Sequence, residues 1–262
     1  MTSPLFVLTS DLGVGSPAVA QLQAVLMAKI PDARLLDLSH AIPPQSIRYA
    51  ELALRSAAFM YPAGTTHVVV VDPGVGTERR ALAVSAGGYT FVGPDNGVLG
   101  VALKRPDAQV VSLTNEDLWR KPVSNTFHGR DIFAPVAAAL ASGAALTDVG
   151  ETIDDPVAST IPDPEIRNAK TIVGETLGAD RFGNLTTNIP VEVGDALLGE
   201  SWSYEVDGKL IPYRSTYMAA KVGRMIVTTG ADRYIEVAVT VGSAEKTLGR
   251  AEGIEIFCTA KR

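Results

Sequence analysis

The sequence predicts an α/β domain followed by a smaller all-β domain. In residues 1–160, short β-branched apolar runs alternate with segments whose apolar residues recur at helical spacing. This alternation is typical of a three-layer domain with a mostly parallel sheet. In residues 169–262, short strand-like runs are separated by turns that contain glycine, which is typical of a small barrel or sandwich. Between them, residues 161–168 include Pro162 and Pro164, and we expect a linker there.

The apolar patterns also predict the individual elements. For the first domain we expect strands at 5–9, 33–38, 66–71, 80–85, 89–92 and 108–113, and helices at 17–29, 47–60, 98–104 and 131–141. For the second domain we expect strands at 171–177, 202–206, 225–229, 234–239 and 254–259.

Composition narrows the class of protein. The chain has 46% apolar residues, a net charge of −6 and no basic run, which argues against nucleic acid or an anionic membrane as a partner. No apolar run reaches the ~18 residues of a membrane span, and the first residues lack the pattern of a signal peptide. We therefore expect a cytoplasmic protein. Its single cysteine, Cys258, lies in an apolar alternation and is expected to be a core residue.

The stretch from Thr66 to Arg80 predicts the position of a site. Four valines end at Asp72, and Pro73 and two glycines then turn the chain toward Arg79. Such a run is typical of a strand buried on both faces, and open α/β sheets bind ligands beyond the carboxyl ends of these strands. Asp72 and Arg79 are therefore candidate site residues. The alternative is that Asp72 only caps the turn by accepting bonds from the next backbone amides.

Several common chemistries do not fit the motifs. The glycines after Asp72 lack the third glycine of a dinucleotide site, and there is no phosphate loop and no nucleophile elbow. The three histidines never fall at metal-ligand spacing, and we expect neither a metal nor a cofactor. His67 lies inside the valine strand and is expected to be structural, whereas His40 ends a strand and is a modest candidate for function.

His128 is a stronger candidate. It lies in a polar loop, 124–131, that opens a predicted helix. A helix N-terminus disfavours an imidazolium, and a neutral histidine near Asp72 and an arginine could activate or orient water. The alternative is a histidine that merely caps the helix.

In the second domain, residues 180–188 concentrate polar side chains around an aromatic residue and a glycine. As pure structure this segment is a hairpin turn. As a binding site it is a clamp for a planar ligand, in which Phe182 stacks and Asn184 and Asn188 pair with heteroatoms of a base. The residues alone leave both interpretations open.

Five motifs occur in an order that resembles one family. They are Ser10-Asp11-Leu12-Gly13, Val71-Asp72-Pro73-Gly74-Val75-Gly76-Thr77, Pro94-Asp95-Asn96-Gly97, Phe127-His128-Gly129-Arg130-Asp131-Ile132-Phe133-Ala134-Pro135 and Asp180-Arg181-Phe182-Gly183-Asn184. Together they resemble the S-adenosylmethionine (SAM) hydroxide adenosyltransferases, which are related to the fluorinase and chlorinase. The resemblance implies an α/β domain, a β domain and a homotrimer whose sites lie between one subunit's N-terminal domain and a neighbour's C-terminal domain.

The resemblance also implies residue roles. It assigns the water to a catalytic set of Asp72, Arg79 and His128, and the ribose hydroxyls to Asp11. It places Phe182 and Asn184 around the adenine, with Asp180 as a further substrate-binding residue. The halogenases have other residues at the Asp72 and His128 positions, so retention of both favours water over halide as the nucleophile.

The implied reaction is hydrolysis of SAM to adenosine and methionine by in-line attack at the ribose 5′ carbon. The sulfonium leaves as a neutral thioether, so the burden falls on water, whose pKa of about 15.7 makes it a poor nucleophile. Asp72 or His128 could take its proton, and Arg79 could stabilise hydroxide character. The alternatives are a halogenase, a hydrolase of another 5′-substituted adenosine, and a non-catalytic adenosine-binding protein.

The chain departs from the family at the amino-acid end of the substrate. Relatives usually carry an acidic and a hydroxyl residue shortly after the Asp11 turn, where this chain has Ser16 and Ala18. Near Gly230 the family tends to have Asn-Ser followed by a glycine, where this chain has Ala231 and Asp232. The sequence therefore supports the adenosyl half of the site more strongly than the methionine half.

Overall fold

The structure is a computed structural model that describes residues 3–168, 170–198 and 202–260. Contacts divide the chain into two compact units, Met1–Thr160 and Ile161–Arg262, and each unit is described by itself. The segment 161–168, which we expect from its prolines to be a linker, belongs to the second unit. There Glu165–Arg167 forms strand β8 and pairs with the next strand along the chain.

The first unit alternates strands and helices as its sequence predicts. Its strands and α-helices are β1 (Leu5–Ser10), α1 (Pro17–Lys29), β2 (Arg34–Ser39), α2 (Ile47–Ala57), β3 (Thr66–Val70), β4 (Ala81–Ala86), β5 (Tyr89–Pro94), α3 (Gly100–Leu103), β6 (Gln109–Ser112), α4 (Ala134–Ala141) and β7 (Glu151–Thr152). Short 3-10 turns lie at Ala58–Met60, Glu116–Leu118 and Leu146–Asp148, and a π-helical turn, η3 (Gly129–Phe133), precedes α4.

These strands form one seven-stranded mixed sheet in the order β2-β1-β3-β5-β4-β6-β7. β2, β1, β3 and β5 are parallel neighbours, whereas the β5–β4, β4–β6 and β6–β7 pairs are antiparallel. Since two antiparallel steps restore the direction, only β4 and β7 run against the rest. The prediction of an α/β domain with a mostly parallel sheet is confirmed.

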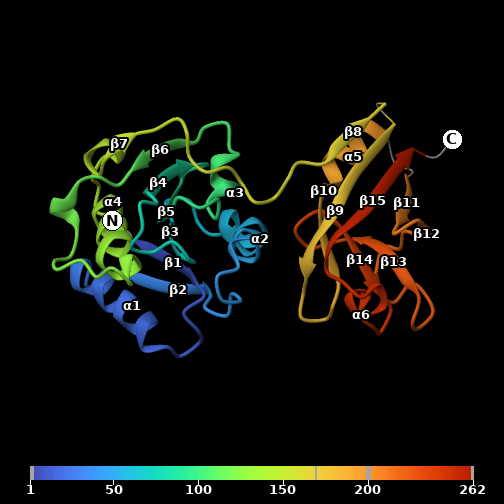
Figure 1. Ribbon diagram of the computed structural model, residues 1–262, viewed down its shortest axis with the longest axis horizontal. Helices are drawn as coiled ribbons and strands as arrows, with labels where there is room; N and C mark the ends of the chain where they lie inside the picture. Colours follow the sequence, from blue (N-terminus) through green and yellow to red (C-terminus); the bar gives the residue numbers. More distant parts are fainter. Residues whose placement is uncertain (1–2, 169, 199–201, 261–262) are drawn as a thin grey trace. The chain divides into compact units, whose positions relative to one another are not determined.

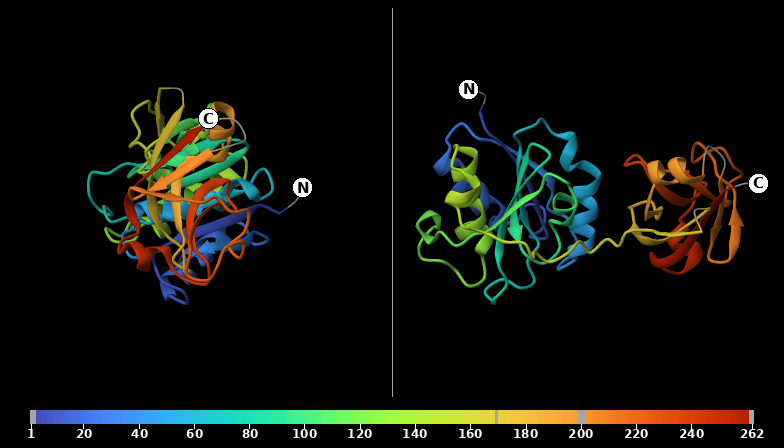
Figure 2. Two further views of the ribbon diagram at one scale, coloured as in Figure 1. Left: turned by 90° about the vertical axis from the view of Figure 1, so that its right-hand side faces the viewer. Right: turned by 90° about the horizontal axis from the view of Figure 1, so that it is seen from above.

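The valine run of β3 is central because both of its faces are covered. Val68 and Val70 belong to the core cluster that includes residues of α1 and α4, whereas Val69 and Val71 belong to the cluster that includes residues of α2 and α3. Side chains of a strand alternate between faces, so a strand between two helical layers must be apolar at every position. The three layers are visible in the N-terminal part of Figure 1 and again in the right-hand view of Figure 2.

The register of the sheet brings two acidic turns to one edge. β1 and β3 are parallel neighbours in which Ser10 is aligned with Val70. Asp11 and Asp72 therefore follow two adjacent strand ends, at the same side of the sheet. The π-helical turn reaches this edge through Gly129, where an added Cβ would lie 2.7 Å from a Val70 methyl carbon. That close approach delivers the preceding residue, His128, to the strand ends.

The second unit is built from antiparallel strands. Its further elements are β9 (Thr171–Ala179), β10 (Leu185–Pro190), α5 (Val191–Leu198), β11 (Trp202–Val206), β12 (Lys209–Ile211), β13 (Met225–Thr229), β14 (Tyr234–Val239), α6 (Ala244–Leu248) and β15 (Glu252–Ala260). All five strands that the sequence predicts are present. β8, β10 and β12 are additional, because their short or hydroxyl-rich runs give little apolar signal.

The strands of the second unit form a nearly closed barrel in the order β12-β11-β15-β9-β10-β14-β13, with β8 beside β9. The two ends approach each other after β12, where Val227 N donates to Pro212 O at 3.0 Å and Arg214 N donates to Val227 O at 2.8 Å. Cys258 of β15 is fully buried in the barrel core, as its alternation predicts. Burial raises the pKa of its thiol to about 12. The prediction of a barrel-like β domain is confirmed.

No helix in the described ranges has the length and apolar character needed to cross a membrane.

A buried carboxylate fastens the last residues of the first unit to α2. Glu51 is 1% exposed, and its carboxylate accepts bonds from Ser159 Oγ at 2.5 Å, Thr160 N at 2.8 Å and Thr160 Oγ1 at 2.6 Å. Three donors to one carboxylate compensate for its removal from water. Segment 159–160 is therefore held against the helix.

We expect Glu51→Gln to lower the free energy of unfolding of the first unit by about 1–3 kcal/mol, because the new amide nitrogen would face donors and leave them unpaired. Urea unfolding followed by fluorescence measures the change. Glu116→Gln is the matched control, since Glu116 is exposed and pairs with exposed Lys121 at 2.9 Å. Equal effects of the two substitutions would contradict the buried-carboxylate role.

Candidate active site

Asp72 and Arg79 form a two-pronged ion pair at the strand-end edge. Arg79 Nε donates to Asp72 Oδ1 at 2.8 Å, and Arg79 Nη2 donates to Asp72 Oδ2. Both side chains are nearly buried, and the guanidinium lies over the Phe133 ring at 5.3 Å from its centroid. Because the carboxylate bonds the guanidinium, the alternative that Asp72 merely caps its own turn does not describe the side chain. The two hydrogen bonds of this pair compensate both side chains for their removal from water.

His128 joins this pair from a segment 49 residues further along the chain. Arg79 Nη2 lies 2.9 Å from His128 Nδ1. A guanidinium has only donors, so Nδ1 must be the acceptor, and in the neutral ring the proton lies on Nε2. The His128 side chain makes no capping bond to the helical turn that follows it. The helix-cap alternative is therefore not what the structure contains.

The environment of His128 favours its neutral form. Its pKa is lowered from the usual 6.5, first by burial and then by the positive charge of Arg79, although Asp72 and Asp131 act in the opposite direction. The lowered pKa agrees with the accepted hydrogen bond, since a proton on Nδ1 would face the guanidinium. At neutral pH the ring is therefore an acceptor at Nδ1 and a donor at Nε2.

A cavity of about 280 Å³ opens beside these residues. It contains three of the sequence-predicted site residues, Asp11, Asp72 and His128, and its remaining lining comes from the same strand ends and loops: Leu12, Gln45, Val70, Pro73, Val75, Thr126, Phe127 and Gly129. Asp11 is held by Gln45, whose backbone N–H donates to Asp11 Oδ2 at 2.8 Å. The volume is slightly below the roughly 300–1,000 Å³ of sites that enclose a drug-sized ligand.

The loops that carry Asp72, Arg79 and His128 touch through a glycine. Gly76 has φ +77, and an added Cβ would lie 2.2 Å from Asn125 O. Only glycine combines this left-handed backbone with so close an approach. The loop between Asp72 and Arg79 is thus seated directly on the segment that leads to His128.

The predicted binding residues of the second unit lie in the turn between β9 and β10. Phe182 is 70% exposed, with its ring on the outside of this turn. Asp180 instead supports the turn itself: its Oδ1 accepts from Phe182 N and Asn184 N at 2.8 and 2.9 Å, and its Oδ2 accepts from Asn184 Nδ2 at 3.0 Å. Both interpretations of this segment, hairpin turn and exposed aromatic clamp, therefore have a structural counterpart. Asn188 bonds Glu175 N and Pro162 O within the unit.

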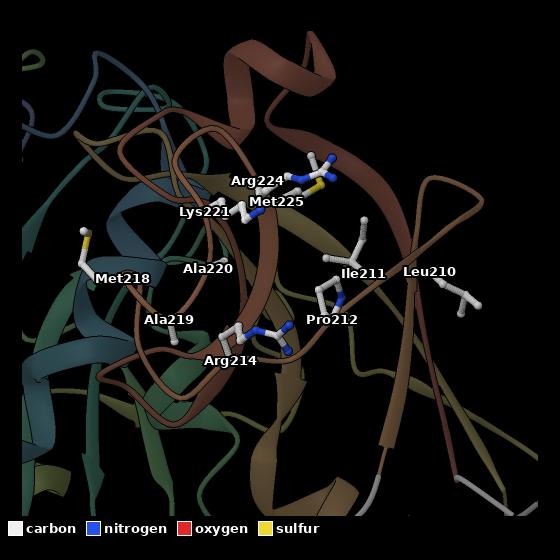
Figure 3. A pocket seen from close by; sticks show the side chains of 10 residues that line it. All are labelled: Leu210, Ile211, Pro212, Arg214, Met218, Ala219, Ala220, Lys221, Arg224 and Met225. Carbon is white, nitrogen blue, oxygen red and sulfur yellow. The ribbon is translucent and has the colours of Figure 1, made fainter.

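A larger cavity, of about 840 Å³, lies elsewhere in the second unit, at the junction of β12 and β13 (Figure 3). Arg214, Lys221 and Arg224 line it together with apolar side chains such as Met218. None of the sequence-predicted site residues belongs to it. The larger cavity is therefore separate from the residues that the sequence predicts for the site.

The other histidines are structural in their contacts. His67 bonds Ala58 O at 3.0 Å and stacks on Phe91, and burial lowers its pKa to about 4. His40 Nδ1 lies 2.6 Å from Ser10 Oγ, directly below the Asp11 turn. In the described part of the chain, no group of three or more histidine, cysteine or acidic residues is arranged to hold a metal ion.

Sequence reasoning missed two contributors to this edge. Gln45 acts through its backbone, which no sequence pattern reveals. The sequence predicts Asp131 only as the start of a helix, whereas it is a completely buried carboxylate that bonds two arginines. Its apolar surroundings after residue 131 were the available signal, because a carboxylate inside such a run must have partners.

The fold and the side chains at the ends of β1 and β3 together define a class of protein. It has an α/β domain that presents an acid–guanidinium–imidazole set at its strand ends, and this domain is joined to a β-barrel. The N-terminal domain of the SAM hydroxide adenosyltransferases matches residues 6–150, and the C-terminal domain of the same family matches residues 174–257. The chain belongs to the SAM hydroxide adenosyltransferase family, and the resemblance found in the motifs is confirmed.

Relatives match over nearly the whole chain. An (R)-S-adenosyl-L-methionine hydrolase from Thermus thermophilus is 38% identical, with 94% of this chain and 96% of the relative covered. A protein of the same name from Salinispora arenicola is 36% identical, with 99% of each chain covered. The fluorinase of Nocardia brasiliensis is a more distant relative, 23% identical with 97% and 96% covered.

Solved structures share the fold. An uncharacterized conserved protein from Thermotoga maritima matches with a TM-score of 0.85 and 33% identity, with 97% of this chain and 99% of that chain covered. A conserved hypothetical protein from Thermus thermophilus matches with a TM-score of 0.79 and 36% identity, with 98% and 100% covered.

Proposed function

We propose that the protein hydrolyses S-adenosyl-L-methionine to adenosine and L-methionine, with water attacking the ribose 5′ carbon. The observation that carries the proposal is the contact of Asp72, Arg79 and His128 beside the cavity that also contains Asp11. The names of the hydrolase relatives specify the (R) form of the substrate. We extend that preference to this chain as part of the proposal.

In the proposed mechanism, His128 is a donor to the nucleophile. Its Nδ1 is occupied by Arg79, so Nε2–H is the atom available to hold the oxygen of the attacking water. A neutral imidazole donor becomes more valuable as that oxygen gains negative charge. This role differs from that of a general base, because Nε2 already carries a proton.

Asp72 is then the proton acceptor. Each carboxylate oxygen keeps a lone pair beyond its bond to Arg79, and the side chain borders the cavity. As the proton moves to Asp72, Arg79 remains to stabilise hydroxide character in a poorly hydrated site. The sulfonium needs no acid, because it departs as a neutral thioether.

Substrate binding is assigned by the family pattern. Asp11, at the rim of the same cavity, accepts bonds from the ribose hydroxyls in this proposal, with Phe182 stacking on the adenine and Asn184 pairing with it. Asp180 acts by holding the turn of these two residues. Ser16 caps α1 through its bond from Ala18 N at 3.3 Å, so it contributes no charge to the amino-acid end.

We further propose a homotrimer in which the Phe182 turn of one subunit completes the Asp11 edge of a neighbour. Two observations support it: the cavity in the first unit is small, and Phe182 exposes most of its ring. In this trimer the neighbouring subunit would cover the exposed ring of Phe182.

The direct test is incubation with (R)- and (S)-S-adenosyl-L-methionine in water enriched in oxygen-18. We expect adenosine labelled at its 5′ oxygen together with unlabelled methionine, and faster turnover of the (R) form; mass spectrometry measures both products. The same reaction with fluoride or chloride should give no 5′-halogenated adenosine. Unlabelled adenosine, a halogenated product, or adenosine binding without turnover would overturn the proposal.

We expect His128→Gln to keep more activity than His128→Asn. A glutamine can place an N–H near the Nε2 position and preserve the donor, whereas an asparagine can replace only the Nδ1 acceptor that Arg79 uses. Steady-state kinetics should show a loss of about 10²–10⁴ in kcat for His128→Asn and a markedly smaller loss for His128→Gln, with adenosine affinity unchanged in both. Equal, complete loss in both would instead identify His128 as the base.

Shared sites predict complementation between two defective chains. Asp72→Asn damages the first unit and Phe182→Ala the second, so co-expressed chains should form some trimers with intact sites. Equal mixing should restore about a quarter of wild-type activity, because each half of a site is intact with a probability of one half. Asp72→Asn mixed with His128→Asn is the matched control, since both lesions lie in the same unit. No rescue in the first mixture would contradict a shared site.

A further inference from the structure

Asp131 lies behind the proposed catalytic set and does not border the cavity. It is fully buried, and its carboxylate accepts four hydrogen bonds. Oδ1 accepts from Arg120 Nη1 at 3.0 Å and Arg130 Nε at 2.8 Å, and Oδ2 accepts from Ser124 N at 2.9 Å and Arg130 Nη2 at 2.8 Å. These bonds lower the pKa of Asp131 despite its burial, so it stays ionised.

These bonds fix the whole segment that carries His128. Arg120 N donates to Asp131 O at 2.8 Å, which joins the two ends of segment 120–131, and the bond from Ser124 N holds its middle. Arg130 also reaches α1, where its Nη1 donates to Gln21 Oε1 at 2.8 Å. His128 is three residues before Asp131, inside the part that these bonds enclose.

The opposite side of segment 120–131 is closely packed. Asn125 O is the atom against which Gly76 packs so closely that no side chain fits there. Gly129 meets Val70 with similarly little room. The His128 backbone is therefore held by packing against the Asp72–Arg79 loop and the end of β3, and by the hydrogen bonds to Asp131.

We infer that Asp131 is a positioning residue for His128: it holds segment 120–131 so that His128 Nδ1 accepts from Arg79 and Nε2–H faces the cavity. The inference rests on the proposed role of His128. Replacing one oxygen of Asp131 by an amide nitrogen would leave two of these donors without that acceptor, one from Arg130 and the other from Arg120 or Ser124 N. A buried network that loses one of its charged acceptor oxygens rearranges, because the donors left without it must find other partners.

The tautomer of His128 is the sharpest readout. The groups facing its ring are Arg79 and Asp72 from the neighbouring loop and Asp131 behind it, with Asp11 across the cavity. Loss of the Asp131 charge would lower the His128 pKa, whereas loss of the Arg79 contact would raise it. A measured change in the His128 pKa would therefore not identify its cause. The position of the proton on the ring does, because the bond from Arg79 excludes the proton from Nδ1.

The experiment compares full-length wild type with Asp131→Asn by nitrogen-15 NMR of the imidazoles. The chain has three histidines, and His128→Asn assigns the relevant signals. In the wild type we expect one Nε2–H tautomer for His128. In Asp131→Asn we expect a mixture of tautomers, a fall in kcat of about 10–100-fold, and an adenosine dissociation constant unchanged within about twofold.

Glu116→Gln serves as the control, since it removes an exposed charge just before the same segment and should change none of these. A folded Asp131→Asn that keeps the single Nε2–H tautomer and the wild-type kcat overturns the inference. If Asp131→Asn does not fold, Arg120→Gln replaces it, because Arg120 is half-exposed. It should give the same tautomer change with a loss of about 3–10-fold in kcat, and an unchanged His128 ring would overturn the inference. Absence of SAM hydrolysis by the wild type would refute the proposed function alone, because the tautomer is measured without turnover.

Discussion

The paired bonds between Arg79 and Asp72 are the interaction on which the site depends. They neutralise two charges at an edge with little water, where either charge alone would be costly. They also orient the guanidinium so that Nη2 reaches a second acceptor, His128 Nδ1. One arginine therefore pairs with the carboxylate and selects the histidine tautomer.

The sheet provides the rigid frame for this interaction. The valines of β3 alternate between two core clusters, one on each face of the sheet. The end of the strand therefore cannot move without disturbing both clusters. β1 is held beside it in parallel register, which places Asp11 next to Asp72. The loops beyond the strands are free to carry function because the strands below them are fixed.

Two glycines and one buried acid complete the arrangement from the other side. Gly76 and Gly129 permit contacts that a Cβ would prevent. Asp131 accepts hydrogen bonds from donors within segment 120–131. The second unit has a similar arrangement, because Asp180 accepts hydrogen bonds from a turn whose Phe182 side chain is exposed. In both units a carboxylate fixes the segment that carries a candidate site residue.

The sequence by itself determined the two-domain class, nearly every long strand and the identity of the residues at the strand ends. These follow from local causes, namely β-branched runs, helical spacing and turn residues, and from motifs long enough to reveal the family. Asp72, Arg79 and His128 were identified in this way. The apolar pattern of the sequence did not predict β10, because the hydroxyl-rich run of this strand gives little apolar signal.

Only the tertiary structure decided how those residues act. The Arg79–His128 bond joins residues 49 positions apart, and its direction fixes a proton that no sequence pattern records. The burial of Asp131 and the use of Asp180 within its own turn likewise depend on which donors the fold brings near each carboxylate. Hydrogen-bond partners are set by three-dimensional proximity, and for that reason the chemistry of the site could be located from the sequence but not assigned atom by atom.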